Sequence, residues 1–181
     1  LHISNAINRS PSSPSRGADY VGADYRPAEV KVQVSLRTKV AEGLLLPHAD
    51  LWFAYTQRSL WQLWSGRASA PFRSTDYEPE MIYVVPVDEP AWGDWRWRML
   101  QLGLLHQSNG QSAPLSRSWN RVYAAAALDR GPYTLQFRLY QRLPEGHDDD
   151  NPDVTRKLGL AEVQASWLRG AATWALQWRT R

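Results

Sequence analysis

The stretch VKVQVSLRTKV at residues 30–40 restricts the fold more than any other part of the chain. Apolar residues occupy alternate positions, among them Val30, Val32 and Val34, and polar residues lie between them. Successive side chains of a β-strand point to opposite faces of the sheet, so a period of two indicates a strand with one apolar and one polar face. A helix would repeat its apolar positions every three or four residues, and no segment shows that period convincingly. The sequence therefore predicts an all-β protein.

Seven further segments carry a strand signal and are separated by stretches rich in turn residues. The eight predicted strands are 30–40, 50–64, 77–87, 95–108, 117–128, 132–143, 154–168 and 171–180. Residues 1–29 are rich in Ser, Pro, Gly and Asp and are predicted to form a loop, within which LHISNAIN allows the remnant of a first strand. We therefore divide the chain into this segment and a β-barrel domain at residues 30–181.

The connections between the predicted strands differ in length in a regular way. Those at 65–76, 109–116 and 144–153 are long, whereas those at 129–131 and 169–170 are tight turns. Outer-membrane barrels combine short turns at one end with long loops at the other. Together with ten Trp and eight Tyr, this asymmetry favours an antiparallel transmembrane β-barrel. A soluble β-sandwich or lipocalin-like barrel would show the same alternation and stays open as the alternative.

Charge and cysteine content exclude several classes of function. The net charge is +3 and the pI is about 9.3, but the basic residues are scattered along the sequence. A nucleic-acid interface would need a denser basic face, so no nucleic-acid partner is predicted. The chain has no cysteine, which excludes disulfides and thiolate metal sites.

Three polar residues of hydrolase type accompany an apolar row. In segment 95–108 the alternation places His106 and Ser108 on the same face as the preceding leucines. If this segment and the next form a hairpin about residue 113, Asn120 lies across from His106, with the Cβ atoms about 4.5–5.5 Å apart. Ser108 would then be a nucleophile, His106 its general base and Asn120 the group that orients the imidazole. The alternative interpretation is a polar hairpin end without chemistry.

Five motifs are spread over most of the chain. They are VKVQVSL, AYTQRSLWQLW, SAPFRSTDYEPE, HQSNGQSAPLSRSWNR and DDDNPDVT. Together they resemble the outer membrane phospholipase A family of Gram-negative bacteria. The resemblance implies a twelve-stranded barrel that hydrolyses acyl esters of phospholipids and lysophospholipids, needs calcium and is active as a dimer. Carried over by motif, the lipid-facing triad is Ser108 as nucleophile, His106 as base and Asn120 as orienting residue.

The resemblance also implies calcium ligands. They correspond to the main-chain carbonyl of Gln111, the hydroxyl of Ser116 and, from the second subunit, the carbonyl of Ser69. Oxygen ligands suit a hard cation such as Ca²⁺. Asp150 matches a family residue that can contribute to calcium binding, although an acidic loop of this kind can equally be solvated. The amide of Gly110 is a candidate second donor to an oxyanion.

A glutamine within an apolar row indicates a contact between subunits. Gln57 shares its predicted face with Leu51, Phe53 and Tyr55. A polar amide facing lipid is costly unless it is paired, and the resemblance places this glutamine at a homodimer contact. The alternative is that Gln57 lies at the level of the wet interface.

These features together predict a calcium-dependent phospholipase in the outer membrane of a Gram-negative bacterium, with membrane phospholipids as substrate and a homodimer as the active form. A catalytically silent barrel fragment or a lipid-binding barrel is the alternative. The sequence departs from the family in two respects. The loop GQSAPLS contains no carboxylate, and about eight strands are present of an expected twelve, so the chain is expected to be truncated at both ends.

Overall fold

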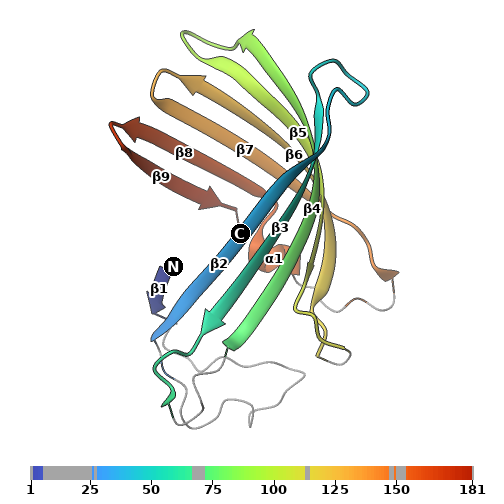
Figure 1. Cartoon of the computed structure of the whole chain (residues 1–181), viewed down its shortest axis with the longest axis vertical. Coiled ribbons are helices and arrows are strands. Elements are labelled where there is room, and N and C mark those ends of the chain that lie inside the picture. Colours follow the sequence, from blue (N-terminus) through green and yellow to red (C-terminus); the bar gives the residue numbers. More distant parts are fainter. Residues whose placement is uncertain are drawn as a thin grey trace. The chain divides into compact units, whose positions relative to one another are not determined.

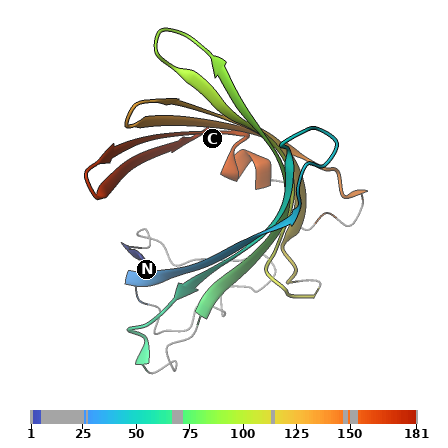
Figure 2. The same cartoon turned by 45° about the horizontal axis from the view of Figure 1, so that its top comes forward.

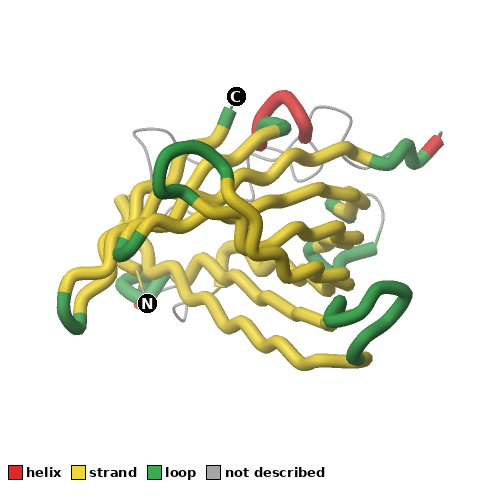
Figure 3. Tube along the Cα trace, turned by 90° about the horizontal axis from the view of Figure 1, so that it is seen from above, coloured by secondary structure: helices red, strands yellow, loops and turns green. Residues whose placement is uncertain are grey.

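The computed structural model describes residues 2–5, 26, 28–66, 72–112, 115–146, 149 and 154–180. These residues form nine β-strands and one short α-helix (Figure 1). The strands are β1 (His2–Asn5), β2 (Ala28–Ala41), β3 (Asp50–Trp61), β4 (Phe72–Pro90), β5 (Arg96–Ser108), β6 (Ser118–Arg130), β7 (Tyr133–Arg142), β8 (Ala161–Arg169) and β9 (Ala172–Arg179). The helix is α1 (Val154–Leu158). The predominance of strand is evident in Figure 3, where strands are yellow and the helix is red.

The nine strands form one sheet in sequence order, from β1 to β9. The all-β, antiparallel fold class predicted from the alternation is thereby confirmed. Contacts between residues divide the chain into two compact units, to both of which β2 to β6 contribute residues. The first unit comprises Leu1–Leu36, Tyr55–Pro79 and Gln107–Ser118, and the second comprises Arg37–Ala54, Glu80–His106 and Trp119–Arg181.

One predicted strand was wrong at its start. The sequence predicted a strand over 154–168, but Val154–Leu158 forms a helix and β8 begins only at Ala161. Gly159 ends the helix with a φ of 78°, as a glycine in the left-handed conformation commonly does. A Cβ at this position would overlap the main-chain carbonyl of Thr180, so space also requires glycine. The prediction failed because a helix of five residues is too short to show a 3.6-residue period in the sequence.

Other boundaries moved by smaller amounts. Strand β4 extends beyond the predicted 77–87 at both ends, and β3 ends at Trp61 instead of residue 64. Near the N-terminus, β1 pairs antiparallel with β2, with His2 opposite Lys31 and Asn5 opposite Ala28. No helix in the described part of the chain has the length and apolar character needed to cross a membrane.

The second unit contains two tight hairpins. Strands β6 and β7 pair up to Arg130 opposite Tyr133, and β8 and β9 pair up to Arg169 opposite Ala172, so two residues form each turn. Gly131 and Gly170 open these turns with φ of 54° and 61°. A positive φ at the first turn position suits the right-handed twist of the strands, and glycine adopts it without steric cost. Strands β7, β8 and β9 lie side by side in Figure 2.

The two faces of β5 and β6 in the second unit have opposite character. Leu100, Leu102 and Leu104 are 46%, 62% and 51% exposed, whereas Gln101 and Tyr123 are 7% and 3% exposed. Leucines therefore face outward while polar and aromatic side chains pack on the other face. A soluble sheet buries its leucines against a core, whereas a membrane barrel presents its apolar face to lipid. This arrangement agrees with a transmembrane barrel and disfavours the soluble β-sandwich.

A buried polar cluster ties three strands of the first unit together. Glu29 on β2 is 3% exposed and accepts two hydrogen bonds from Arg73 on β4, at 2.7 and 2.9 Å. Gln62, just after β3, donates to the same carboxylate at 3.0 Å and accepts from Ser65 at 3.2 Å. A buried carboxylate is tolerated only when it is paired and hydrogen-bonded. The cluster therefore fixes these strand ends relative to one another.

Candidate active site

A histidine and an asparagine meet across β5 and β6 in the second unit. His106 Nδ1 lies 2.9 Å from Asn120 Oδ1, and both residues are half-buried. An amide oxygen can only accept a hydrogen bond, so Nδ1 carries the proton in this pair. The other ring nitrogen, Nε2, then keeps its lone pair and can accept a proton. The structure thus brings together the predicted base and its orienting group, in the tautomer that a general base needs.

The orientation of the Asn120 amide is set by a carboxylate. Asn120 Nδ2 donates to Glu145 Oε1 at 2.9 Å, which leaves its Oδ1 for His106. The main chain supports this contact, because Leu143 N donates to Asn120 O at 2.9 Å where β7 ends beside β6. Sequence reasoning missed Glu145, since the segment LPEG after β7 has the composition of a loop. The register of β6 against β7 could have indicated Glu145. Because Arg121 lies opposite Arg142, the residues that follow Arg142 come next to Asn120.

Ser108 belongs to the first unit and follows His106 by two residues on β5. Its hydroxyl Oγ accepts a hydrogen bond from Gly110 N at 3.0 Å. Gly110 has a φ of 67°, and a Cβ there would lie 2.9 Å from the ring of Tyr77, so both conformation and space require glycine. A main-chain N–H held beside a nucleophilic oxygen is a suitable donor for the oxyanion that forms after attack.

The loop that follows Ser108 is held in shape by Asn109. Its Oδ1 accepts from the main-chain N–H of Arg117 at 2.9 Å and of Gln111 at 3.3 Å. Its Nδ2 donates to Leu115 O at 3.0 Å, and its own N–H donates to Arg117 O at 3.1 Å. The sequence did not single out Asn109. The structure shows that one side chain closes the loop that contains two of the predicted calcium ligands.

The described calcium-ligand candidates offer oxygen donors. Gln111 is exposed and Ser116 is half-buried, and a carbonyl and a hydroxyl are suitable donors for a hard cation. The carbonyl of Ser116 accepts a hydrogen bond from the Arg117 guanidinium at 2.5 Å, and the hydroxyl of Ser116 is the predicted ligand. Ser69 and Asp150 lie outside the described residues. Among the residues that the structure describes, no cluster of three or more His, Cys, Asp or Glu could hold a metal ion.

Gln57 has polar neighbours along its own strand in the first unit. Its Oε1 accepts from Tyr55 Oη at 3.4 Å and its Nε2 donates to Ser59 Oγ at 3.5 Å. Ser59 Oγ in turn lies 3.0 Å from the hydroxyl of Thr75 on β4. Both hydrogen bonds of the Gln57 amide are long, so this amide is weakly held within one subunit.

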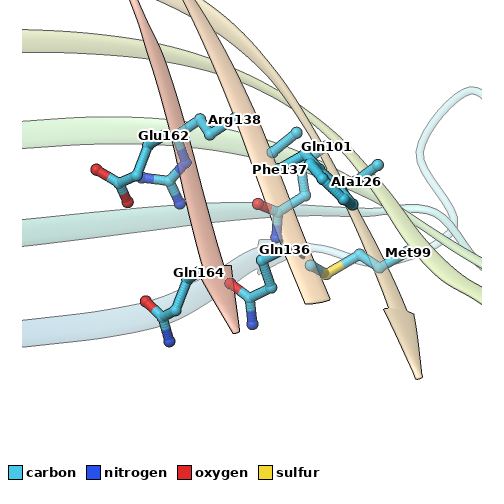
Figure 4. A pocket seen from close by; sticks show the side chains of 9 residues that line it. Met99, Gln101, Ala126, Gln136, Phe137, Arg138, Glu162 and Gln164 are labelled. Carbon is cyan, nitrogen blue, oxygen red and sulfur yellow. Dashed lines mark hydrogen bonds between the residues drawn. The ribbon is translucent and has the colours of Figure 1, made fainter. Parts of the chain in front are cut away.

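A polar hollow of about 180 Å³ lies on the second unit (Figure 4). Figure 4 shows Gln136 and Gln164 projecting the same way from the neighbouring strands β7 and β8, where they are directly paired. The carboxylate Glu162 in its lining is bound by Arg179. The lining residues contain no serine, threonine or histidine, so the hollow offers no nucleophile beside a base and is not the candidate site.

The comparisons with known proteins agree with one another. The family model described as phospholipase A1 matches residues 1–181. A relative from Neisseria meningitidis serogroup B is 47% identical over 175 residues, covering 92% of this chain and 45% of its own length. The phospholipase A1 of Escherichia coli is 37% identical over 147 residues, covering 81% of this chain and 50% of its own. The chain thus spans about half the length of the curated relatives it matches.

Two solved structures share the fold. The outer membrane phospholipase A from Escherichia coli matches with a TM-score of 0.77 and 35% identity, over 85% of this chain and 59% of that one. An outer membrane phospholipase dimer with bound calcium from Salmonella typhi matches with the same TM-score and identity, over 84% of this chain and 59% of that one.

Proposed function

Because the chain belongs to the phospholipase A1 family, we propose that it acts as a phospholipase that hydrolyses acyl ester bonds of phospholipids and lysophospholipids. The chain has the antiparallel β-barrel fold of outer membrane phospholipase A and belongs to the outer membrane of a Gram-negative bacterium. The observation that carries the proposal is the 2.9 Å contact between His106 Nδ1 and Asn120 Oδ1, which leaves Nε2 able to accept a proton.

The proposed reaction proceeds in two halves. Ser108 Oγ attacks the ester carbonyl carbon while His106 Nε2 takes the hydroxyl proton. Asn120 Oδ1 holds the resulting imidazolium through its Nδ1–H, and the Gly110 amide donates to the oxyanion. Collapse of the tetrahedral intermediate expels the lysolipid alkoxide, which receives the proton from His106. Water then attacks the acyl-serine with His106 again as base, releasing the fatty acid and restoring Ser108.

The surroundings of the site suit a substrate that comes from the membrane. The exposed leucines Leu102 and Leu104 precede His106 on the same strand and form an apolar row for acyl chains. A neutral asparagine suits this position, because an isolated carboxylate beside hydrocarbon would carry a large desolvation cost.

Calcium and a second subunit are part of the proposal. Gln111 O, Ser116 Oγ and Ser69 O from the second subunit would hold Ca²⁺, with Asp150 as a further oxygen donor. When bound, calcium supplies positive charge that stabilises the developing oxyanion. Support comes from the Asn109 side chain, which is hydrogen-bonded to Gln111, Leu115 and Arg117 and so ties the main chain next to Ser116 to that of Gln111. The weakly held amide of Gln57 would gain a partner at the homodimer contact.

A serine-directed label tests the proposal directly. The full-length protein, refolded in detergent, should react with a fluorophosphonate at Ser108, because the base activates that hydroxyl alone. Ser108→Ala and His106→Ala should abolish both labelling and phospholipid hydrolysis, while the control Ser166→Ala on β8 should keep both. Normal turnover by Ser108→Ala would show that the nucleophile is assigned wrongly. A folded wild-type protein without labelling or hydrolysis would favour the catalytically silent barrel.

A further inference from the structure

A chain of polar contacts continues from Asn120 away from the histidine. Asn120 Nδ2 donates to Glu145 Oε1 at 2.9 Å, and Glu145 Oε2 lies 3.5 Å from Arg142 Nη2. Arg142 also forms an ion pair with Asp149. The side chains of Arg142 and Glu145 are only 14% and 15% exposed. The contacts therefore form a largely solvent-shielded series that ends on the base of the proposed triad.

We propose that Glu145 is a positioning residue that fixes the orientation of Asn120 and, through it, the tautomer of His106. This inference rests on the proposed function and deepens it. The two ends of an asparagine amide have nearly the same shape, so packing alone does not distinguish them. An ionised carboxylate only accepts hydrogen bonds, and it therefore selects the orientation in which the NH₂ group faces Glu145 and the oxygen faces His106.

The wrong amide orientation would disable the base. If the NH₂ group of Asn120 faced the ring, Nδ1 would have to accept and Nε2 would have to carry the proton. Nε2 could then take no proton from Ser108. A carboxylate on Nδ2 also polarises the amide, which strengthens the contact between its oxygen and the imidazolium that forms during reaction.

Two features hold Glu145 in place. Leu143 N donates to Asn120 O at 2.9 Å, which fixes the main chain two residues before the carboxylate. Arg142 bridges Glu145 and Asp149, so a positive charge lies beside the carboxylate on the side away from Asn120. The alternative role for Glu145 is purely structural, as one member of an ion pair at the end of β7.

Kinetics of the full-length protein in detergent separate the two roles. Glu145→Ala should lower kcat about 10- to 100-fold, as loss of a supporting partner often does, and leave KM nearly unchanged. Glu145→Gln keeps the size of the side chain but can turn either its oxygen or its NH₂ group towards Asn120, so it should recover only part of that rate. Glu162→Gln is the matched control, since that carboxylate is bound by Arg179 at 3.0 Å on another strand pair of the same unit, and it should keep the wild-type kcat.

A double-mutant cycle provides the decisive measurement. If Glu145 acts through Asn120, Glu145→Ala should cost nothing further in the Asn120→Ala background. An equal loss in both backgrounds, or a wild-type kcat in folded Glu145→Ala, overturns the proposal. If hydrolysis persists in Ser108→Ala, the proposed function fails instead. An inactive Ser108→Ala beside a fully active Glu145→Ala refutes only the role of Glu145.

A second pair of variants does not depend on the folding of Glu145→Ala. Asn120→Asp alone sets two carboxylates against each other, whereas its combination with Glu145→Gln restores an N–H donor between the two side chains. The double variant should therefore be at least 10-fold more active than Asn120→Asp alone. A double variant that is no more active than Asn120→Asp contradicts the proposal.

Discussion

Gly103→Ala should destabilise the protein strongly, although it adds a single methyl group. A Cβ at Gly103 on β5 would lie 2.6 Å from the hydroxyl oxygen of Tyr123 and closer still to its ring, well inside the 3.0 Å limit that real Cβ atoms keep. Tyr123 is 3% exposed, so its ring has no free space into which to move. Either β5 and β6 separate locally or the ring leaves its site.

The magnitude follows from what Tyr123 would lose. Its ring lies 5.8 Å from that of Tyr140, a contact of about 0.5–1.5 kcal/mol. The Arg138 guanidinium lies 4.6 Å above it, which contributes about 0.5–2 kcal/mol. Overpacking itself costs about 1–3 kcal/mol, and replacing glycine in a strand returns about 0.5–1 kcal/mol. We therefore expect a loss of about 2–4 kcal/mol in the free energy of unfolding.

Denaturant titration of the refolded full-length protein measures this loss. Tryptophan fluorescence reports unfolding, and the shift in midpoint at constant slope gives the change in free energy. Gly66→Ala is the matched control, because no atom of the described residues lies within 4 Å of the Cβ position and its φ is outside the left-handed region, so its midpoint should not fall. In a Tyr123→Ala background, Gly103→Ala should cost almost nothing. A loss below about 1 kcal/mol in the single variant, or the same loss in both backgrounds, would refute the steric argument.

Three further predictions concern the site and its support. Asn120→Ala should lower kcat about 10- to 100-fold, because one hydrogen bond to a charged group is worth about 1.5–3 kcal/mol, whereas His106→Ala should lower kcat about 10⁴-fold or more. Equal losses of kcat in a steady-state assay would argue against an orienting role for Asn120. Chelation of calcium should reduce hydrolysis and the dimer fraction together, because calcium that stabilises the dimer must also bind more tightly to the dimer. An unchanged dimer fraction in sedimentation experiments in detergent would refute that linkage. Arg73→Met should cost about 3–5 kcal/mol in unfolding free energy, because the buried Glu29 carboxylate loses its cationic partner, and pairing it with Glu29→Gln should recover much of the loss. A double variant as unstable as Arg73→Met would contradict this.

Part of the candidate site could be predicted from local pattern alone. Strand alternation predicted His106 and Ser108 on one face, and hairpin geometry predicted Asn120 opposite His106. In the structure, Asn120 Oδ1 lies 2.9 Å from His106 Nδ1. The expectation for His106 and Asn120 is met because these two residues lie on consecutive strands joined by one loop. Their catalytic roles stay predictions.

Contacts made by side chains in loop segments escaped the sequence. Glu145 reaches Asn120 from 25 residues away and lies in a segment of loop composition. No role was predicted for Asn109, yet its side chain binds the main chain of Leu115 and Arg117. In both cases the residue type permits the contact but does not specify the partner, because a polar side chain in a loop can bind any donor or acceptor within reach.

The sequence by itself determined the β class, the order of the long strands and the row that ends in His106 and Ser108. These features depend on a period of two, which each strand carries within its own residues. The tertiary structure decided which face of the sheet is exposed, since a period of two divides the side chains into two sets without assigning either set to lipid or to the packed face. The tertiary structure also decided the position of Glu145 and the orientation of the Asn120 amide, because both depend on the pairing of β7 with β6.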